Sequence, residues 1–317
     1  MSEQDKPGGG CCSASRNAET PLPVADVAIA AGVGARAFPI AIPGGRSHVG
    51  ANRPDIPLDG EGPLREVKLK PYALEAQTVT IARFREFVET TGYVTEAERF
   101  GWSAVFAGLL PEGAEVSGNA SGTPWWVRID GADWRHPEGP LSSIADRLDH
   151  PVTQVSLADA KAFAAYVGGR LPNEAEWERA AHGGHRDRKF PWGNEEPTDE
   201  KIFCNIWQGR FPTQNTVVDG YFGTAPARAF TPNDGGFYNM SGNVWEWTSD
   251  SYRIRSLSKH AKQRNAQAVE QNEQLLKGGS FLCHISYCYR YRIVARMALT
   301  PDSAASNVGF RIAYNAA

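Results

Sequence analysis

The chain has 317 residues, enough to bury a large core in one long domain or two ordinary ones. Its 33 basic and 36 acidic residues nearly cancel, so the bulk charge favours neither a nucleic-acid partner nor an anionic membrane surface. No run reaches the roughly 20 apolar residues of a membrane span, and the first residues lack the basic and apolar pattern of a secretory signal. We therefore expect no membrane or nucleic-acid partner.

The five cysteines form an odd set without the spacing of a disulfide scaffold: Cys11, Cys12, Cys204, Cys283 and Cys288. Such a set favours a reducing compartment and thiols that react or bind metal. The expected location is the cytoplasm.

Residues 1–36 are rich in Gly, Ala, Ser and Pro without a clear period, which predicts a flexible N-terminal tail. A single domain is expected over residues 37–317. It opens with two alternating segments, at residues 38–50 and 64–75, that read as strands joined by turns.

Three helices are predicted next. The first runs from a cap at Thr80 to Gly92, the second follows Ser156, and the third follows Asn173. From about residue 190 the composition favours long ordered loops, and the polar segment 253–274 is expected to project into solvent. We find no internal repeat.

The segment GGSFLCHISYCYRYR, at 278–292, holds two cysteines five positions apart, Cys283 and Cys288. This is not the C-x-x-C spacing of zinc sites, and no second pair completes a tetrahedral set. Two thiolates suit a soft ion of low coordination, above all Cu(I), and leave room for a third sulfur. A pair of inert buried thiols or a disulfide between neighbouring turns is the alternative reading.

Several phrases, in order, resemble the formylglycine-generating enzymes, also called sulfatase-modifying factors. They are IPGG at 42–45, RLPNEAEWERAAHGG at 170–184, PWGN at 191–194, NIWQGRFP at 205–212, NMSGNVWEWTSD at 239–250, and the cysteine segment followed by TPDSAASNVGFR at 300–311. The resemblance covers roughly residues 38–315 and implies an α+β, loop-rich variant of the C-type-lectin fold. The first four phrases mark only that fold, whereas the cysteine pair is absent from non-catalytic paralogues and from the related iron-dependent sulfoxide synthases.

The resemblance implies that Cys283 and Cys288 hold Cu(I). A cysteine of an extended sulfatase polypeptide, in the motif C-x-[PA]-x-R, would join the metal and be oxidised by O2 to Cα-formylglycine with an external thiol reductant. Ser280 matches a serine beside the oxygen site, and Trp245 matches the indole that lines the oxygen pocket. Arg290 and Arg292 could favour the thiolates or, equally, form salt bridges between loops. We expect a monomer.

The resemblance also implies two structural Ca2+ sites and a peptide groove. One calcium set is Asn205, the Ile206 carbonyl, Asp219 and the Tyr221 carbonyl; the other is Asn239, the Gly242 and Val244 carbonyls, and Glu246. Ser103 and Asn307 match groove positions. Where some members place an aspartate for the target arginine, this chain has Trp102, on which an arginine could stack instead.

At four positions where secretory members carry two disulfides, this chain has apolar residues: Ala164, Ala181, Ile293 and Ile312. This agrees with the expected reducing compartment.

The tail itself contains the target pattern, as Cys12, Ala14 and Arg16. This suggests a self-substrate or a competing ligand, although Ala and Ser are common in the tail. Two other readings of the whole chain stay open. One is a non-catalytic lectin-like binding or scaffolding module, and the other is an iron sulfoxide synthase, which the scattered histidines disfavour.

Overall fold

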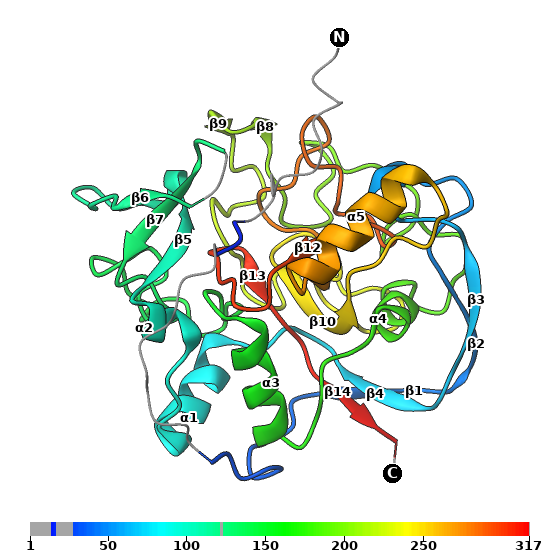
Figure 1. Cartoon of the computed structure of the whole chain (residues 1–317), viewed down its shortest axis with the longest axis horizontal. Coiled ribbons are helices and arrows are strands. Elements are labelled where there is room, and N and C mark those ends of the chain that lie inside the picture. Colours follow the sequence, from blue (N-terminus) through cyan, green and yellow to red (C-terminus); the bar gives the residue numbers. More distant parts are fainter. Residues whose placement is uncertain (1–13, 17–27, 121–122, 317) are drawn as a thin grey trace.

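The computed structural model describes residues 14–16, 28–120 and 123–316. Within those ranges the helices are α1 (Ile81–Thr91), α2 (Glu96–Phe100), α3 (Leu157–Tyr166), α4 (Glu174–Ala181) and α5 (Lys259–Glu270), with 3-10 turns at Pro57–Asp59 and Ala107–Leu109 (Figure 1). Between α4 and residue 244 the described chain is mostly irregular, as the composition predicted.

The three predicted helices are confirmed as α1, α3 and α4. Ser156 and Asp159 form a reciprocal capping box at the start of α3, and Asn173 and Glu176 do the same for α4. Thr80 precedes α1, but its side chain makes no capping hydrogen bond. The apolar stripes and capping residues therefore predicted the positions of all three helices. Thr80 acts as the N-cap of α1 through its backbone conformation alone.

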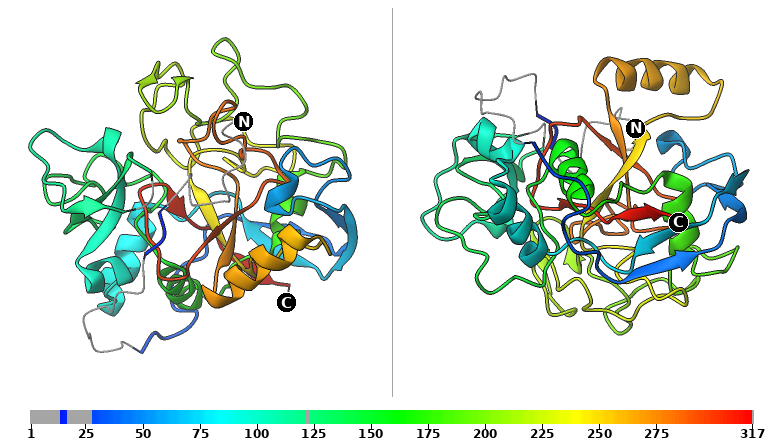
Figure 2. Two further views of the ribbon diagram at one scale, coloured as in Figure 1. Left: turned by 45° about the horizontal axis from the view of Figure 1, so that its top comes forward. Right: turned by 90° about the horizontal axis from the view of Figure 1, so that it is seen from below.

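Two described helices were missed. Thr95 and Glu98 form a capping box that begins α2, a signal that was present in the sequence. The polar segment 253–274, which was expected to project into solvent, contains α5, capped by Ser258 and mostly exposed. Only Ala261 and Ala268 of this helix are buried, so it has no broad apolar stripe, and Figure 2 shows it along the outer edge of the molecule.

Small sheets surround the loops. Their strands are β1 (Pro39–Ile42), β4 (Tyr72–Glu75) and β14 (Ala313–Asn315) in one antiparallel sheet; β2 (Gly45–Val49) with β3 (Arg65–Leu69); β5 (Trp102–Phe106), β7 (Trp126–Asp130) and β6 (Gly118–Asn119); and β8 (Gly209–Arg210) with β9 (Gln214–Asn215). The two predicted strand segments are thus confirmed as β1 with β2 and as β3 with β4. Because β14 pairs with β4, the last described residues close the fold against its first strands.

A four-stranded sheet of order β12-β11-β10-β13 matters most for function. Its strands are β10 (Trp245–Ser251), β11 (Gln274–Lys277), β12 (Met297–Leu299) and β13 (Val308–Gly309). Glu246 pairs with Lys277 in the antiparallel β10–β11 ladder, and Trp245 pairs with Val308 in the parallel β10–β13 ladder. The start of β10, the end of β11 and the start of β13 therefore meet at one edge of this sheet.

The main core joins α1 and α3 through aromatic side chains. The ring centroid of Phe84 lies 5.4 Å from those of Phe87 and Trp134, and all three rings are buried. Burial of each such side chain contributes about 2–3 kcal/mol. Among the described residues, none of the helices combines the length and apolar character needed to cross a bilayer.

The described parts of the segment predicted as a flexible tail make specific contacts. The amides of Gly32 and Gly34 donate to the carbonyls of Ala165 and Tyr166, at 3.0 and 2.9 Å, at the end of α3. Ala14 and Arg16 are buried against the domain. The tail composition did not reveal these contacts because they depend on the distant surface that the segment meets. Residues 1–13, Cys12 included, and residues 17–27 lie outside the described residues.

Candidate active site

Cys283 and Cys288 lie in the loop that joins β11 to β12, and both are buried. Their Sγ atoms are 3.2 Å apart. The loop brings them together by a tight turn, since the amide of Cys288 donates to the carbonyl of His284 at 2.8 Å. The structure therefore brings together two buried sulfurs from residues that are five positions apart; Cys283 is a free thiol, whereas Cys288 is disulfide-bonded.

Two glycines let the chain enter this loop. Gly278 and Gly279 have φ values of 101° and 75°, which side chains with a Cβ rarely adopt. A Cβ on Gly279 would also lie 2.9 Å from the carbonyl oxygen of Arg290. The Gly-Gly pair thus permits the sharp exit from β11 and the close return of the chain after Cys288.

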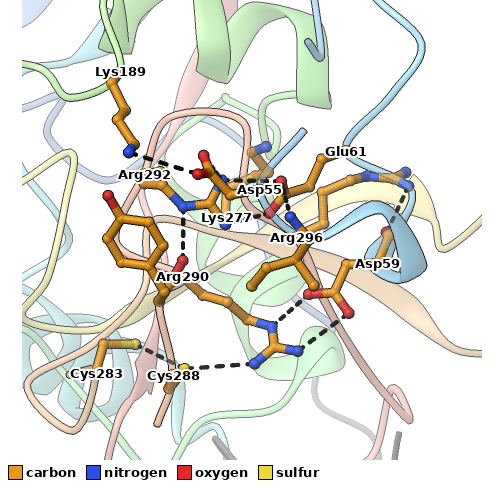
Figure 3. Close-up of polar contacts among 12 residues, drawn as sticks. Asp55, Asp59, Glu61, Lys189, Lys277, Cys283, Cys288, Arg290, Arg292 and Arg296 are labelled. Carbon is orange, nitrogen blue, oxygen red and sulfur yellow. Dashed lines mark hydrogen bonds and ion pairs between the residues drawn. The ribbon is translucent and has the colours of Figure 1, made fainter. Parts of the chain in front are cut away.

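Two donors approach the sulfurs from opposite ends of the loop. The backbone amide of Ser280 lies 3.4 Å from Sγ of Cys283. A guanidinium nitrogen of Arg290 lies 3.8 Å from Sγ of Cys288, and the same guanidinium is held by Asp59, with Nε 2.5 Å from Oδ2 (Figure 3). A hydrogen-bond donor and a fixed cation therefore lie beside the two sulfurs.

Ser280, Asn307 and Trp245 form a connected set beside the cysteine pair. Nδ2 of Asn307 donates to Oγ of Ser280 at 3.0 Å, and the amide of Trp245 donates to the Asn307 carbonyl at 2.8 Å. The indole N–H of Trp245 is buried and has no hydrogen-bond partner among the described residues. The sheet edge thus brings Ser280, Cys283, Asn307 and Trp245 together, as the sequence predicted for catalytic and groove residues.

The sequence analysis assigned no role to Cys204, which is buried near Cys283. Burial raises the pKa of the Cys204 thiol well above its usual value, and the charges of Asp219 and Cys283 act in the same direction. Cys204 is thus a neutral thiol rather than a third thiolate ligand. Its position could not be found from the sequence, because Cys204 and Cys283 are 79 positions apart and the chain between them includes β10, α5 and β11.

The sequence left two roles open for Arg290 and Arg292, stabilisation of the thiolates or salt bridges between loops. The structure gives the two residues different roles. Arg292 is fully buried, with both terminal nitrogens on Glu61, at 2.6 and 2.9 Å. It is a salt-bridge residue that ties the loop to residues 55–61 (Figure 3). Arg290 combines both roles, since it pairs with Asp59 and contacts Cys288.

The first predicted calcium set suits a hard cation. Oδ1 of Asn205 is buried without a partner among the described residues, and burial raises the pKa of the half-buried Asp219 carboxyl. The Gln208 side-chain amide donates to both the Ile206 carbonyl and Oδ2 of Asp219, at 2.5 and 2.9 Å. This polar group gathers the oxygens that a cation would bind. Tyr221 belongs to the same turn, because its amide donates to Oδ1 of Asp219 at 2.9 Å.

The second predicted set fits less well. Oδ1 of Asn239 is buried and has no partner among the described residues, as a calcium ligand would require. However, Glu246 already binds Arg311 through both oxygens, at 2.6 and 2.7 Å, and accepts the Trp177 indole N–H. One lone pair of Oε1 remains for a cation. The Gly242 and Val244 carbonyls lie in the same loop just before β10.

The predicted groove residues lie on β5 and on the loop before β13. Ser103 is fully buried, with its hydroxyl 2.5 Å from Oε1 of Gln154 and 3.0 Å from the Ala304 carbonyl. Its hydroxyl therefore makes internal hydrogen bonds, and its assignment to a peptide groove stays a prediction. Trp102, by contrast, has the guanidinium carbon of Arg16 at 4.4 Å from its ring centroid and that of Arg128 at 4.5 Å. Trp102 is thus an arginine-stacking surface in this fold.

An irregular, C-type-lectin-like α+β domain with a buried cysteine pair at the edge of its four-stranded sheet defines the class. The family model described as a Sulfatase-modifying factor enzyme 1-like domain matches residues 33–316, and the chain belongs to this family. It is 49% identical to the formylglycine-generating enzyme of Thermomonospora curvata, over 86% of this chain and 92% of the relative. It is 47% identical to that of Bos taurus, over 86% of this chain and 74% of the relative.

Two further comparisons limit what membership of this family implies about activity. The chain is 43% identical to a Bos taurus protein named inactive C-alpha-formylglycine-generating enzyme 2, over 87% of this chain and 85% of the relative. Among solved structures, PvdO from Pseudomonas aeruginosa superposes with a TM-score of 0.60 at 21% identity, covering 94% of this chain and all of PvdO. The second likeness shows the fold alone. Because the family also includes relatives named inactive, activity has to be argued from the site.

Proposed function

We propose that this protein is a formylglycine-generating oxidase that converts a cysteine of sulfatase polypeptides, in the motif C-x-[PA]-x-R, to Cα-formylglycine. The observation that carries the proposal is the pair of buried Sγ atoms 3.2 Å apart, with the Ser280 amide on one and Arg290 beside the other. The relatives named formylglycine-generating enzyme, at 47 and 49% identity, support the same activity.

With Cys288 reduced from its disulfide, the two sulfurs would fit Cu(I), a soft ion that accepts two thiolates and leaves a position for a third. Copper, when bound, would supply one-electron chemistry with O2 and a binding position for the substrate thiolate. Among the described residues no cluster of three or more His, Cys, Asp or Glu side chains is arranged to hold a metal, which disfavours zinc or a three-histidine iron site within those ranges.

The overall reaction balances with an external thiol as reductant. A substrate –CH2–SH, one O2, two electrons and two protons give –CHO, H2S and H2O, and two reductant thiols supply those electrons and protons as they form a disulfide. The protein has to hold the substrate cysteine at the dithiol, exclude bulk water and orient polar groups.

The residues around the dithiol suit these tasks. Ser280 presents a buried hydroxyl that Asn307 orients, and Trp245 contributes a buried N–H that is open for a ligand. Arg290 supplies a fixed positive charge on the Cys288 side. Aromatic side chains that include Trp207 and Tyr291 pack in the same buried cluster as the two cysteines, and they would keep water away from the site.

The test is aerobic incubation of the copper-loaded protein with a peptide containing Cys-Thr-Pro-Ser-Arg and a thiol reductant, followed by mass spectrometry. We expect an aldehyde in place of the peptide thiol. Cys283→Ala and Cys288→Ala should abolish it, whereas Cys204→Ala, which removes a neutral buried thiol nearby, should retain it. Product formation by either pair variant, or none by the unmodified protein, would overturn the proposal and favour a binding module.

We also propose Ca2+ as a structural ion at the Asn205–Asp219 set. The buried unpartnered Oδ1 of Asn205 and the desolvated carboxylate of Asp219 support a cation there. A second ion beside Asn239 is supported only by the orphaned oxygen of that side chain.

A further inference from the structure

Residues 12–16 read Cys-Ser-Ala-Ser-Arg, the pattern of the proposed target motif. Cys12 lies outside the described residues, whereas residues 14–16 are described. In Figure 1 this short dark-blue segment lies beside β13, far in sequence from everything around it. The contacts of residues 14–16 can therefore be compared with what the motif requires.

Arg16 is 4% exposed and lies in an aromatic site. Its guanidinium carbon is 4.4 Å from the ring centroids of both Phe100 and Trp102. A desolvated guanidinium is attracted to the negative faces of both aromatic rings. Trp102 is the residue that the sequence analysis placed where the target arginine is recognised.

The backbone of the groove also holds Arg16. Its Nε donates to the Asp302 carbonyl at 2.9 Å, and its amide donates to Oγ of Ser303 at 3.1 Å. Burial raises the pKa of the nearby Glu96 carboxyl, while the charge of Arg16 acts in the opposite direction. Arg16 is therefore matched by aromatic faces, carbonyls and acidic groups together, which is a built site for a guanidinium.

Ala14 meets the second requirement of the motif. It is 2% exposed and belongs to the same buried core cluster as Trp102, so a larger or charged side chain at this position would have to displace its neighbours. Positions three and five of the motif, the small residue and the arginine, are thus both buried in the predicted groove. Asn307, the other predicted groove residue beside Ser103, donates to Ser280, whose amide lies beside Cys283.

We infer that residues 14–16, the last three of the motif, are an intramolecular ligand of the target groove, which competes with sulfatase peptides for the site. This inference rests on the proposed function in its assignment of the groove. A target with its arginine on Trp102 carries its cysteine four positions earlier, the spacing of Cys12 and Arg16. Tethering gives the segment an effective concentration on the order of millimolar, so even modest affinity would occupy the groove.

The experiment measures binding of a fluorescein-labelled peptide containing Ser-Thr-Pro-Ser-Arg, in which serine replaces the reactive cysteine, by anisotropy with the full-length protein. We expect Arg16→Ala to bind the peptide about tenfold tighter than the unmodified protein, because the anchor of the competitor is removed. Ala14→Glu should act in the same direction, since the larger charged side chain cannot enter the buried position.

Arg36→Ala is the matched control, because Arg36 also stacks on an aromatic ring, that of Tyr314, but outside the groove. It should bind the peptide as the unmodified protein does. Equal dissociation constants for all four proteins, or no binding by any of them, would overturn the inference. The assay needs neither copper nor turnover. Tighter peptide binding by Arg16→Ala would therefore support the inference even if the protein never oxidises the peptide. Failure of this inference can thus be distinguished from failure of the proposed activity.

Discussion

Arg290 and Arg292 are two residues apart in the cysteine loop, yet only Arg290 contacts a sulfur. Arg292 is directed away, onto Glu61, because the loop turns between them. The same division appears at the groove, where Trp102 faces an arginine and its neighbour Ser103 is fully buried. Alternation along a strand explains this second case, since successive side chains of β5 point to opposite faces.

Ser280 allows a residue-scale prediction. Ser280→Ala removes the hydroxyl that Asn307 orients beside Cys283, so we expect kcat/KM to fall about a hundredfold with Cu(I) affinity unchanged. Steady-state kinetics and a Cu(I) titration check this. Ser241→Ala is the control, because that buried hydroxyl has no partner among the described residues. Loss of Cu(I) binding by Ser280→Ala would instead make Ser280 part of the metal site.

At the residue scale the sequence predicted much of the site but not its contacts. Ser280, Cys283 and Cys288 stand in one short segment, so their proximity followed from spacing and resemblance. The stacking of Arg16 on Phe100 did not, because no local pattern records which surface a segment 84 positions away will meet. The neutral thiol Cys204 escaped notice for the same reason.

At the scale of elements, the cysteine loop is held by a second loop, residues 55–61. Asp59 pairs with Arg290, and Glu61 pairs with Arg292 (Figure 3). Sequence patterns predicted three of the five described helices and the first strand segments but could not predict this bracing, which joins charges about 231 positions apart. Helices such as α3 are stabilised by capping residues that are close in sequence. The two loops are instead stabilised by ion pairs between residues far apart in sequence.

The bracing can be tested with Glu61→Gln. The change leaves the Arg292 guanidinium buried with only Asp55, at 3.1 Å, as a carboxylate partner. Removal of one partner from a buried pair costs about 3 kcal/mol, which denaturant unfolding measures. Glu66→Gln, which removes an exposed partner of Arg46, should leave the free energy of unfolding unchanged. Equal effects of the two substitutions would show that the buried pair contributes no more than the exposed one.

For the whole molecule, the long loops between α4 and β10 need support beyond strand pairing, and calcium is the proposed source. Saturation with a ligand at 100 times its Kd adds about 2.7 kcal/mol to the free energy of unfolding. We expect calcium to raise the Tm and EGTA to lower it, with Asp219→Asn losing most of the increment. An unchanged Tm on calcium addition would exclude the ion.

Asp219 also predicts a pH dependence for the calcium-free protein. Its folded-state pKa is raised by burial, so the folded state binds the proton more tightly than the unfolded state does. The contribution of this group is therefore favourable at low pH and is lost as pH rises from the unfolded pKa through the higher folded pKa. In EGTA at neutral pH, Asp219→Asn should unfold at the same or a higher temperature than the unmodified protein. A lower Tm would mean that the ionised carboxylate stabilises the fold without a cation.

The central claim is that Cys283 and Cys288 together form a Cu(I) site. The most direct measurement is competition for Cu(I) against a chromophoric chelator under anaerobic conditions. The account predicts one equivalent bound by the unmodified protein and by Cys204→Ala, and loss of that equivalent in both Cys283→Ala and Cys288→Ala. Retention of tight binding by either pair variant, or its absence in the unmodified protein, would contradict the claim.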